Sequence, residues 1–307
     1  MIGFDRTVPP NGYAWWYVDA LSDDGRHGIT LIAFIGSVFS PYYAAARRRG
    51  PADPKHFVAL NVALYGAPRR WTMTERGRSR LRAEATQLAI GSSALDWRGD
   101  ALSFAIDEVS APVPSRLRGN VRVLPAALTQ HAFPLDSAGR HRWRPLAPRT
   151  RVEVDLQQPA LRWSGTGYLD SNDGDAPLED DFRCWTWSRA AGRDGSTTVL
   201  YDVECRDGAA TSLALRFDAA GRAAAIDAPP TVKLPPSGWR IARATRGEAG
   251  ARVENTLEHA PFYVRSLVST RLLGEPAVAM HESLDLDRFR SRWVQMLLPF
   301  RMPRRSR

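Results

Sequence analysis

The octapeptide GTGYLDSN, at residues 165–172, places side chains that can do acid–base chemistry at alternate positions. In a β-strand, alternate side chains point to the same face, so Tyr168, Asp170 and Asn172 should share one face of a sheet. A carboxyl group in such a place can act as a general acid when burial raises its pKa. The alternative is a solvated sheet surface that carries a carboxylate beside a half-buried ring.

A second candidate is HRWRP, at residues 141–145, where His141 and Trp143 would share a strand face in the same way. By itself this segment also fits an exposed, arginine-rich edge with one buried tryptophan. Together, the two segments form two pairs with i, i+2 spacing on neighbouring strands. We expect His141, Trp143, Tyr168 and Asp170 to converge in one pocket.

Other kinds of site lack their sequence signals. The six histidines show no HxH or HExxH spacing, and Cys184 and Cys205 form no CxxC pair, so no metal site is expected. There is also no GxSxG elbow, no P-loop and no GxGxxG that opens a helix. The two isolated cysteines favour a reducing compartment over a disulfide framework.

A repeated hairpin organises the chain that must position these residues. WWYVDALSDDG (15–25) and WTWSRAAGRDG (185–195) share Trp, Ala, Asp and Gly at an offset of 170 residues. Each copy predicts a strand, an Asp-Gly turn and a second strand, and the second strands alternate through Ile29, Leu31, Ala33 and through Val199, Tyr201, Val203. This pattern indicates a duplicated all-β architecture of two barrels or sandwiches. We expect a boundary near residue 178, and one helix over 283–298.

Composition narrows the class of protein. A chain of 307 residues is expected to form two domains, and its net charge of +9 comes almost wholly from arginine, with only Lys55 and Lys233 as lysines. Because the arginines follow no nucleic-acid-binding motif, nucleic acid is not an expected partner. The N-terminus carries no signal-peptide pattern, and no run of about 18 apolar residues predicts a membrane span.

The chain is rich in tryptophan, with ten residues that lie mostly in strand-like runs. Most should be buried in cores, since aromatic side chains dominate core burial. A barrel lined by aromatic rings would also suit a long apolar ligand. We assign Trp16, Tyr17 and Trp187, together with Asn172, as candidate substrate-binding residues.

Two long segments resemble a known family. NGYAWWYVDALSDDGRHGITLIAFIGSVFSPYYAAARRRG (11–50) and AGRHRWRPLAPRTRVEVDLQQPALRWSGTGYLDSNDGDAPLEDDFRCWTWSRA (138–190) look like the carotenoid 1,2-hydratases, also called hydroxyneurosporene synthases. The resemblance implies an all-β fold with few helices and two lipocalin-like β-barrel domains in tandem, over residues 1–178 and 179–307. It also implies addition of water to the terminal C1–C2 double bond of an acyclic carotenoid such as neurosporene or lycopene, without a cofactor. The family's functional positions match His141, Trp143, Tyr168 and Asp170.

The chemistry of that reaction needs a strong, well-placed acid. Protonating C2 leaves a tertiary cation at C1, and Asp170 is the candidate donor. A free aspartic acid has a pKa of about 3.9, so remaining protonated near pH 7 requires a rise of roughly 3 pKa units, which burial can supply. Trp143 would stabilise the cation through its ring. His141 or Tyr168 would orient the water, take its proton or hold Asp170, with Asn172 as support.

The C-terminal tail suggests how such a substrate is reached. From Arg288 onward there are seven arginines and no acidic residue, interleaved with apolar residues. We expect a basic amphipathic segment that binds an anionic membrane surface, so that deleting residues 288–307 weakens liposome binding. The expected location is cytoplasmic and peripheral to the membrane. The alternative is a solvated terminal helix with a basic end.

Two other functions fit the same residues. One is a lipocalin-like carrier of a carotenoid or another lipid, because a fold by itself does not decide function. The other is a cofactor-free cyclase or isomerase on the same scaffold, which would also use an acid and a cation-stabilising ring. Asp170 separates the carrier from the enzymes, since a carrier has no need for a buried carboxyl group. Added oxygen in the product separates hydration from cyclisation or isomerisation.

Overall fold

The computed structural model describes residues 3–248 and 250–305, most of them in antiparallel strands. Contacts divide the chain into two compact units. Unit 1 contains residues 1–133, 141–177 and 296–307, and unit 2 contains residues 134–140 and 178–295. The last segment of the chain therefore groups with the N-terminal unit. The predicted domain limits of 1–178 and 179–307 stay a prediction.

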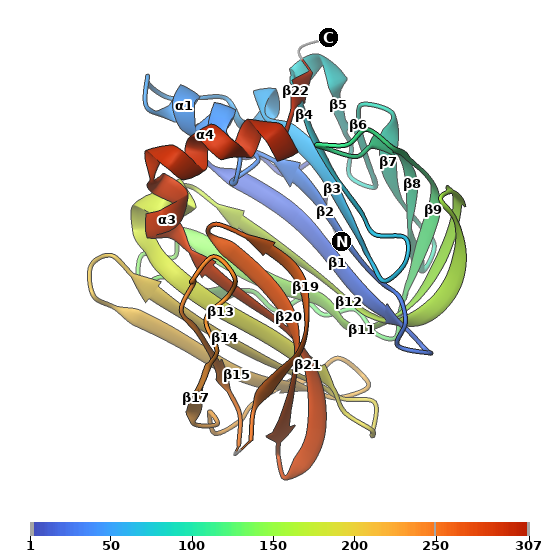
Figure 1. The fold of residues 1–307 in the computed structure, drawn as a ribbon, viewed down its shortest axis with the longest axis vertical. Coiled ribbons are helices and arrows are strands. Elements are labelled where there is room, and N and C mark those ends of the chain that lie inside the picture. Colours follow the sequence, from blue (N-terminus) through green and yellow to red (C-terminus); the bar gives the residue numbers. More distant parts are fainter. Residues whose placement is uncertain (1–2, 249, 306–307) are drawn as a thin grey trace. The chain divides into compact units, whose positions relative to one another are not determined.

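Unit 1 is built on a 13-stranded sheet in the order β22-β4-β3-β2-β1-β12-β11-β9-β8-β7-β6-β5, with β10 paired to β11. Figure 1 shows this sheet curving strongly from β3 to β9. Its strands are β1 (Tyr13–Ser22), β2 (Gly28–Ile35), β3 (Val58–Tyr65), β4 (Arg70–Arg76), β5 (Leu81–Ala83), β6 (Gln87–Ile90), β7 (Ser93–Arg98), β8 (Ala101–Val109), β9 (Arg116–Pro125), β10 (Phe133–Pro134), β11 (His141–Gln158), β12 (Ala160–Gly174) and β22 (Arg304–Arg305). The helix α1 (Pro41–Arg47) and the short 3₁₀ helices η1 (Pro54–His56) and η2 (Arg78–Arg80) lie between strands.

One face of this sheet encloses the main apolar core. Trp16, Val18 and Ala20 of β1 point into it, as do alternate residues of β2, β3, β6 to β9, β11 and β12. The period-2 alternation read from the sequence thus marks the face that is buried in the core. Leu169 is the core residue of β12 that lies next to the candidate site. Tyr168 and Asp170 must therefore point to the opposite face.

Unit 2 is built on a seven-stranded sheet in the order β16-β15-β14-β13-β21-β20-β19, with a separate two-stranded sheet β17-β18. Its strands are β13 (Phe182–Ala191), β14 (Thr197–Cys205), β15 (Ala210–Phe217), β16 (Ala223–Ala225), β17 (Thr231–Leu234), β18 (Arg243–Arg246), β19 (Arg252–Ala260), β20 (Tyr263–Leu272) and β21 (Glu275–Asp285). The helices are α2 (Leu178–Asp181) and α3 (Leu286–Arg290), followed by α4 (Arg292–Arg301), along which the chain passes from unit 2 to unit 1.

The two strand orders confirm the duplication inferred from the sequence. The run β4-β3-β2-β1-β12-β11-β9 of unit 1 has the same connectivity as β16-β15-β14-β13-β21-β20-β19 of unit 2. Both predicted Asp-Gly hairpins are present, as β1–β2 and as β13–β14. β1 therefore corresponds to β13, and β12 corresponds to β21.

The second strands of the two hairpins correspond at an offset of 169 residues, one fewer than the first strands. Leu31 lies opposite Val18 on the core face of unit 1, whereas Tyr201 lies opposite Trp187, the counterpart of Tyr17. The turn of the second hairpin is one residue shorter than that of the first. The residues of β14 at an offset of 170 from β2 therefore point to the opposite face of their sheet. Val199, Tyr201 and Val203 thus share a face with Trp187.

The expected all-β class with few helices is confirmed, but the helix expected over 283–298 is not a single helix. β21 runs to Asp285, and the two helices that follow, α3 and α4, are separated at Ser291. Asp285 caps α3, because its side chain accepts a hydrogen bond from the backbone N–H of Arg288. Each large sheet ends in an edge strand in the hydrogen-bonding order, so its closure into a barrel stays a prediction.

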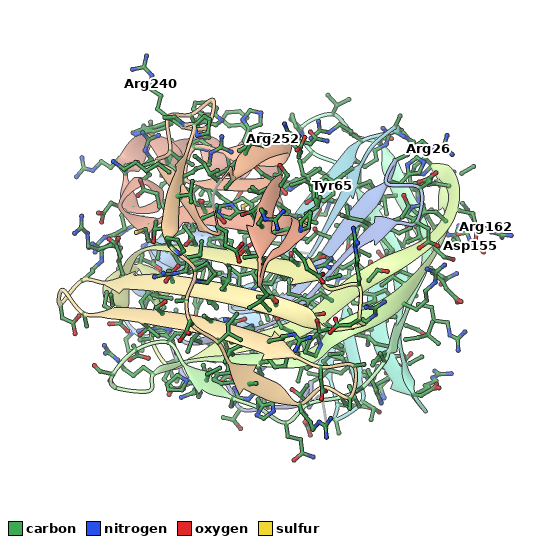
Figure 2. The ribbon with its side chains drawn as sticks, turned by 90° about the horizontal axis from the view of Figure 1, so that it is seen from below. Arg26, Tyr65, Asp155, Arg162, Arg240 and Arg252 are labelled. Atoms are coloured by element: carbon green, nitrogen blue, oxygen red, sulfur yellow. The ribbon has the colours of Figure 1, made fainter. Side chains whose placement is uncertain are left out.

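Many arginines form ion pairs on the surface of each unit. Arg162 on β12 lies 2.8 Å from the carboxylate of Asp155 on β11, and both side chains project outward in Figure 2. Arg151 pairs in the same way with Asp23 at 2.6 Å. Exposed pairs of this kind contribute little stability. They do, however, spread much of the basic charge over the surface in neutralised pairs.

A buried histidine in unit 2 gives the fold a testable pH dependence. His281 lies on β21, and its Nε2 is 2.8 Å from the backbone carbonyl oxygen of Ala244. Burial lowers the pKa of His281 from 6.5 to about 4. Below pH 6.5 this histidine therefore binds a proton in the unfolded chain but not in the folded chain. The free energy of unfolding consequently decreases as the pH falls toward 4. The full loss is roughly 3 kcal/mol, at about 1.36 kcal/mol per pKa unit.

We expect His281→Gln to flatten the dependence of the unfolding free energy on pH between about 6.5 and 4. The measurement is urea unfolding at a series of pH values. His259→Gln, which replaces an exposed histidine, is the matched control and should keep the slope of the parent. An unchanged slope in His281→Gln would show that this histidine is not the responsible group.

Candidate active site

The candidate site lies on three neighbouring strands of unit 1, β1, β12 and β11. Their register places Tyr17 opposite Asp170, and Trp143 opposite Asn172. These side chains point away from the apolar core and are nevertheless buried: Tyr168 and Trp143 are 0% exposed and Asp170 is 5% exposed. Asp170 therefore lies on the sheet face opposite the main apolar core, and not inside that core.

The carboxyl group of Asp170 joins the two sequence motifs. Its Oδ2 atom accepts a hydrogen bond from Trp143 Nε1 at 2.8 Å and another from the Tyr168 hydroxyl at 3.0 Å. Both donors are uncharged and both contact the same oxygen. A proton carried on Oδ1 would therefore compete with neither bond. The ring of Phe133 packs at 5.4 Å from that of Trp143 and holds the indole in place.

Tyr168 is held as a neutral phenol. Burial raises the pKa of Tyr168 well above its usual value of 10, and the neighbouring carboxyl group of Asp170 raises it further. A neutral phenol keeps its proton and donates it in a hydrogen bond. Tyr168 thus fixes the orientation of Asp170 instead of competing with it for negative charge.

Two irregularities in β11 lie directly opposite the acid. Pairing passes from Arg144–Ser171 to Ala147–Leu169 and then to Thr150–Gly167, so two residues of β11 face Asp170 and two face Tyr168, where one would be regular in each case. Bulges of this kind bend a strand and redirect its side chains. Here the first bulge follows Trp143 and lets its indole reach diagonally to Asp170.

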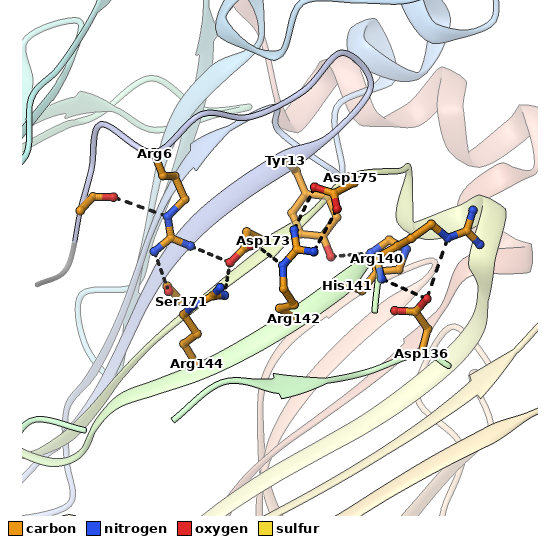
Figure 3. Close-up of polar contacts among 11 residues, drawn as sticks. Arg6, Tyr13, Asp136, Arg140, His141, Arg142, Arg144, Ser171, Asp173 and Asp175 are labelled. Carbon is orange, nitrogen blue, oxygen red and sulfur yellow. Dashed lines mark hydrogen bonds and ion pairs between the residues drawn. The ribbon is translucent and has the colours of Figure 1, made fainter. Parts of the chain in front are cut away.

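His141 forms a second polar contact on the same face. Its Nδ1 lies 2.9 Å from the hydroxyl of Tyr13, across Gly174, which is paired with both residues (Figure 3). A Cβ atom at Gly174 would lie 2.4 Å from the Tyr13 ring and 2.7 Å from His141 Nδ1. The absent side chain therefore creates the space in which Tyr13 and His141 meet.

On the other face, ion pairs hold β11 against β12 immediately behind the site. Asp173 accepts contacts from Arg6 at 2.7 Å, from Arg142 at 2.6 Å and from Arg144 (Figure 3). Arg142 also binds Asp175 at 2.9 Å, and this hydrogen bond is the main reason that the pKa of Asp175 lies below its usual value. These bidentate contacts fix the register that aligns Trp143 with Asp170.

The two glycines of GTGYLDSN allow close approach of strands. A Cβ atom at Gly165 would lie 1.8 Å from the carbonyl oxygen of Leu21, and one at Gly167 would lie 2.6 Å from that of Asp19. Any larger residue would push β12 away from β1. Close packing against β1 is therefore the reason for glycine at these two positions.

The structure brings some of the predicted substrate-binding residues to Asp170 and not others. Tyr17 and Asn172 share its sheet face. Trp16 is on the opposite face, in the apolar core, where it packs against Phe4 at 5.0 Å. Trp187 belongs to unit 2. This placement gives no support to a substrate role for Trp16, because Trp16 points into the core while the next residue, Tyr17, faces Asp170.

Sequence reasoning missed Asp19, which is 0% exposed and lies opposite Tyr168. The hydroxyl of Tyr17 donates to its Oδ2 at 3.1 Å. The signal was available, because Tyr17-Val18-Asp19 repeats the Tyr-x-Asp spacing of Tyr168 and Asp170. The bulges also had a signal in Pro145 and Pro148 of β11, since proline within a strand marks a break in the ladder.

The counterpart of Asp170 in unit 2 has a different environment. Glu282 on β21 lies opposite Trp187, as Asp170 on β12 lies opposite Tyr17. Arg265 donates to its Oε1 from Nε at 2.9 Å and from Nη2 at 2.6 Å. The duplicated position thus holds an ion pair in unit 2 and a carboxyl group with neutral donors in unit 1.

Among residues 3–248 and 250–305, no group of three or more His, Cys, Asp or Glu side chains is placed to hold a metal ion. Within the same part of the chain, no helix has the length and apolar composition that crossing a membrane requires.

Solved structures identify the class of fold. The chain is similar to a protein of Nitrosomonas europaea described as AttH, with a TM-score of 0.59 and 15% identity over 89% of this chain and 91% of that one. It is also similar to kievitone hydratase from Nectria haematococca, with a TM-score of 0.57 and 10% identity over 94% of each chain. These likenesses support the predicted lipocalin-like, mainly β fold.

Sequence relatives identify the family. The family described as carotenoid hydratase CrtC matches residues 31–307. The chain is 61% identical over 305 residues to the acyclic carotenoid 1,2-hydratase of Thiocapsa roseopersicina, covering 98% of this chain and 75% of that protein. It is 53% identical to the enzyme of the same name from Rubrivivax gelatinosus, covering 99% and 76%. The chain belongs to the CrtC carotenoid hydratase family.

The space above Gly174 provides a test of the site's geometry. Gly174→Ala should separate Tyr13 from His141 and destabilise the protein by about 1–3 kcal/mol, the usual cost of overpacking. Thermal or urea unfolding measures the change. Gly77→Ala is the matched control, because a Cβ atom there meets nothing within 4 Å, and it should leave stability nearly unchanged. Equal stability of the two variants would contradict the proposed crowding.

Proposed function

We propose that this protein hydrates the terminal C1–C2 double bond of an acyclic carotenoid, such as neurosporene or lycopene, with Asp170 as the proton donor and without a cofactor. Membership of the carotenoid hydratase family supports the reaction. The observation that carries the mechanism is the pair of uncharged donors, Trp143 and Tyr168, on one oxygen of a buried carboxyl group. Burial disfavours the charged form of such a group, so it favours the protonated acid that alkene protonation needs.

The reaction proceeds in two steps. Asp170 transfers its proton to C2, and the π electrons form the new C2–H bond and leave a tertiary cation at C1. Water then attacks C1 and, after loss of a proton, gives a tertiary alcohol. The Trp143 ring, held at the carboxyl group, would stabilise the cation by roughly 2 kcal/mol in a desolvated site.

The hydrogen bonds favour different roles for Tyr168 and His141. Tyr168 donates to Asp170 and would hold the carboxyl group in position. His141 contacts Tyr13, away from the oxygen to which Trp143 and Tyr168 donate. We therefore assign His141 to the polar end of the site, where it would order water, with Asn172 as a support between them.

Replacing the acid tests this mechanism. Asp170→Asn should lower the rate of carotenoid hydration by about 10²–10⁴-fold, because a positioned general acid typically contributes that much. The assay incubates vesicles that contain neurosporene or lycopene with parent and variant protein and quantifies the hydroxylated product. Asp155→Asn, which removes a surface carboxylate on β11, is the matched control and should keep full activity.

The outcomes separate the competing functions. Equal product from Asp170→Asn and the parent would rule out the acid role of Asp170. A parent that binds the carotenoid and returns it unchanged would indicate a carrier. A product that contains no added oxygen would indicate a cyclase or isomerase.

We also propose that α4 brings the protein to the membrane that holds its substrate. Four apolar residues at helical spacing are exposed on this helix, Trp293 and Leu297 by 44% and 43% and Met296 and Phe300 by 70% each. Such a stripe beside arginines, with no acidic residue from Arg288 onward, is typical of helices that lie on anionic lipid.

Point substitutions test this better than the deletion of residues 288–307, which would also remove β22 and its pairing with β4. Met296→Ser and Phe300→Ser should each weaken binding to phosphatidylglycerol vesicles by about tenfold or more, since burying a large apolar side chain is worth about 1.5–3 kcal/mol. Vesicle sedimentation measures the binding. Val278→Ser, at an exposed position on β21, is the control. Equal binding by all variants would exclude a membrane role for α4.

A further inference from the structure

The strand beside the acid carries a second Tyr-x-Asp motif that the reaction described above does not use. Tyr17 and Asp19 lie on β1, and the register sets Tyr17 opposite Asp170 and Asp19 opposite Tyr168. Two identical motifs on antiparallel neighbours thus face each other, with each aspartate across from the tyrosine of the other. All four side chains share the buried face that points away from the core.

The two motifs form matching hydrogen bonds. Tyr17 donates to Asp19 Oδ2 at 3.1 Å, as Tyr168 donates to Asp170 Oδ2 at 3.0 Å. The two tyrosine rings meet edge to face, with their centres 6.3 Å apart. The negative charge of Asp19 is among the causes that raise the pKa of Tyr168, and so is that of Asp170. Both carboxyl groups therefore interact electrostatically with the same phenol.

Hydration also needs a second proton transfer, from the attacking water to a base. When water attacks C1, the new C1–O bond leaves a positive charge on oxygen, and an O–H bond must break. A base placed beside the acid, with room between them for water and the reacting carbons, is the usual arrangement for such paired transfers. Residues diagonal to each other across an antiparallel pair, as Asp19 and Asp170 are, have Cα atoms about 7–8 Å apart.

We propose that Asp19 is the base that takes the proton from the attacking water, with Tyr17 positioning its carboxylate. The inference rests on the proposed function of carotenoid hydration. The Asp170 O–H bond breaks as C2–H forms. The water oxygen then bonds to C1, and the released proton goes to Asp19. The proton count balances, because Asp170 has lost one proton and Asp19 has gained one. Exchange with solvent restores both groups.

Deuterium labelling separates this role from a structural one. In D₂O, Asp170 delivers a deuteron to C2, and a cation that water does not capture returns to the alkene by losing a proton or deuteron to the Asp170 carboxylate. Asp19→Asn should lower alcohol formation by about 10²-fold, within the range for a positioned base. We define the exchange ratio as the amount of deuterium in the recovered carotenoid divided by the amount of alcohol formed. Asp19→Asn should raise this ratio by at least about tenfold, because the cation would still form while its capture by water slows.

Tyr17→Phe is the second variant, since it keeps the carboxylate and removes only the hydroxyl that positions it. It should shift the ratio in the same direction by a smaller factor, and it decides the question if Asp19→Asn does not fold. Tyr65→Phe is the matched control. It removes a hydroxyl that donates to Thr30, the neighbour of Asp19 on β2, at 3.1 Å, and it should leave the ratio unchanged.

A folded Asp19→Asn variant whose ratio equals that of the parent, because exchange and hydration fall equally, would overturn the proposal. An unchanged ratio in Tyr17→Phe would also overturn it. A parent that forms no alcohol at all would instead overturn the proposed function. Loss of both exchange and hydration in Asp170→Asn, next to a raised ratio in Asp19→Asn, would support the division of acid and base between the two strands.

Discussion

The carboxyl group of Asp170 is buried, and uncharged donors hold it, on a sheet face that does not belong to the main core. Burial disfavours the charged form of a carboxyl group, whereas an adjacent guanidinium favours that form. The surrounding structure serves this one condition. It places an indole and a phenol on a single carboxyl oxygen, and the three arginines that bind Asp173 lie on the other face of the sheet.

The two faces of the unit 1 sheet carry different groups of residues: one face packs the core and the other carries the candidate site. The core face of β12 packs Leu169 and admits close approach at Gly165 and Gly167. Beyond these, Asp173 binds three arginines and fixes the pairing of β11 with β12. The opposite face carries the candidate site. Because successive side chains of a strand alternate, each element that stabilises the register also orients a residue of the site.

Duplication provides an internal comparison. Both units place a carboxyl group at the same point of the same strand order, yet Glu282 forms an ion pair with Arg265 while Asp170 meets Trp143 and Tyr168. The same strand order therefore accommodates both environments, and the side chains around each carboxyl group make the difference between them. In β1 and β12 a second, local repetition of Tyr-x-Asp gives the site two carboxyl groups within one sheet face.

The sequence by itself determined the all-β class and the duplicated Asp-Gly hairpins, since turn chemistry and period-2 alternation are local. It also pointed to His141, Trp143, Tyr168 and Asp170 as candidate residues, through family motifs that are local as well. It did not reveal which face those residues occupy, because alternation is the same whichever face packs against the core. It also left Asp19 unnoticed and did not reveal that the second hairpin turn is one residue shorter than the first. Those features depend on strand partners, bulges and turn lengths that lie far apart in the chain, and so only the tertiary structure decided them.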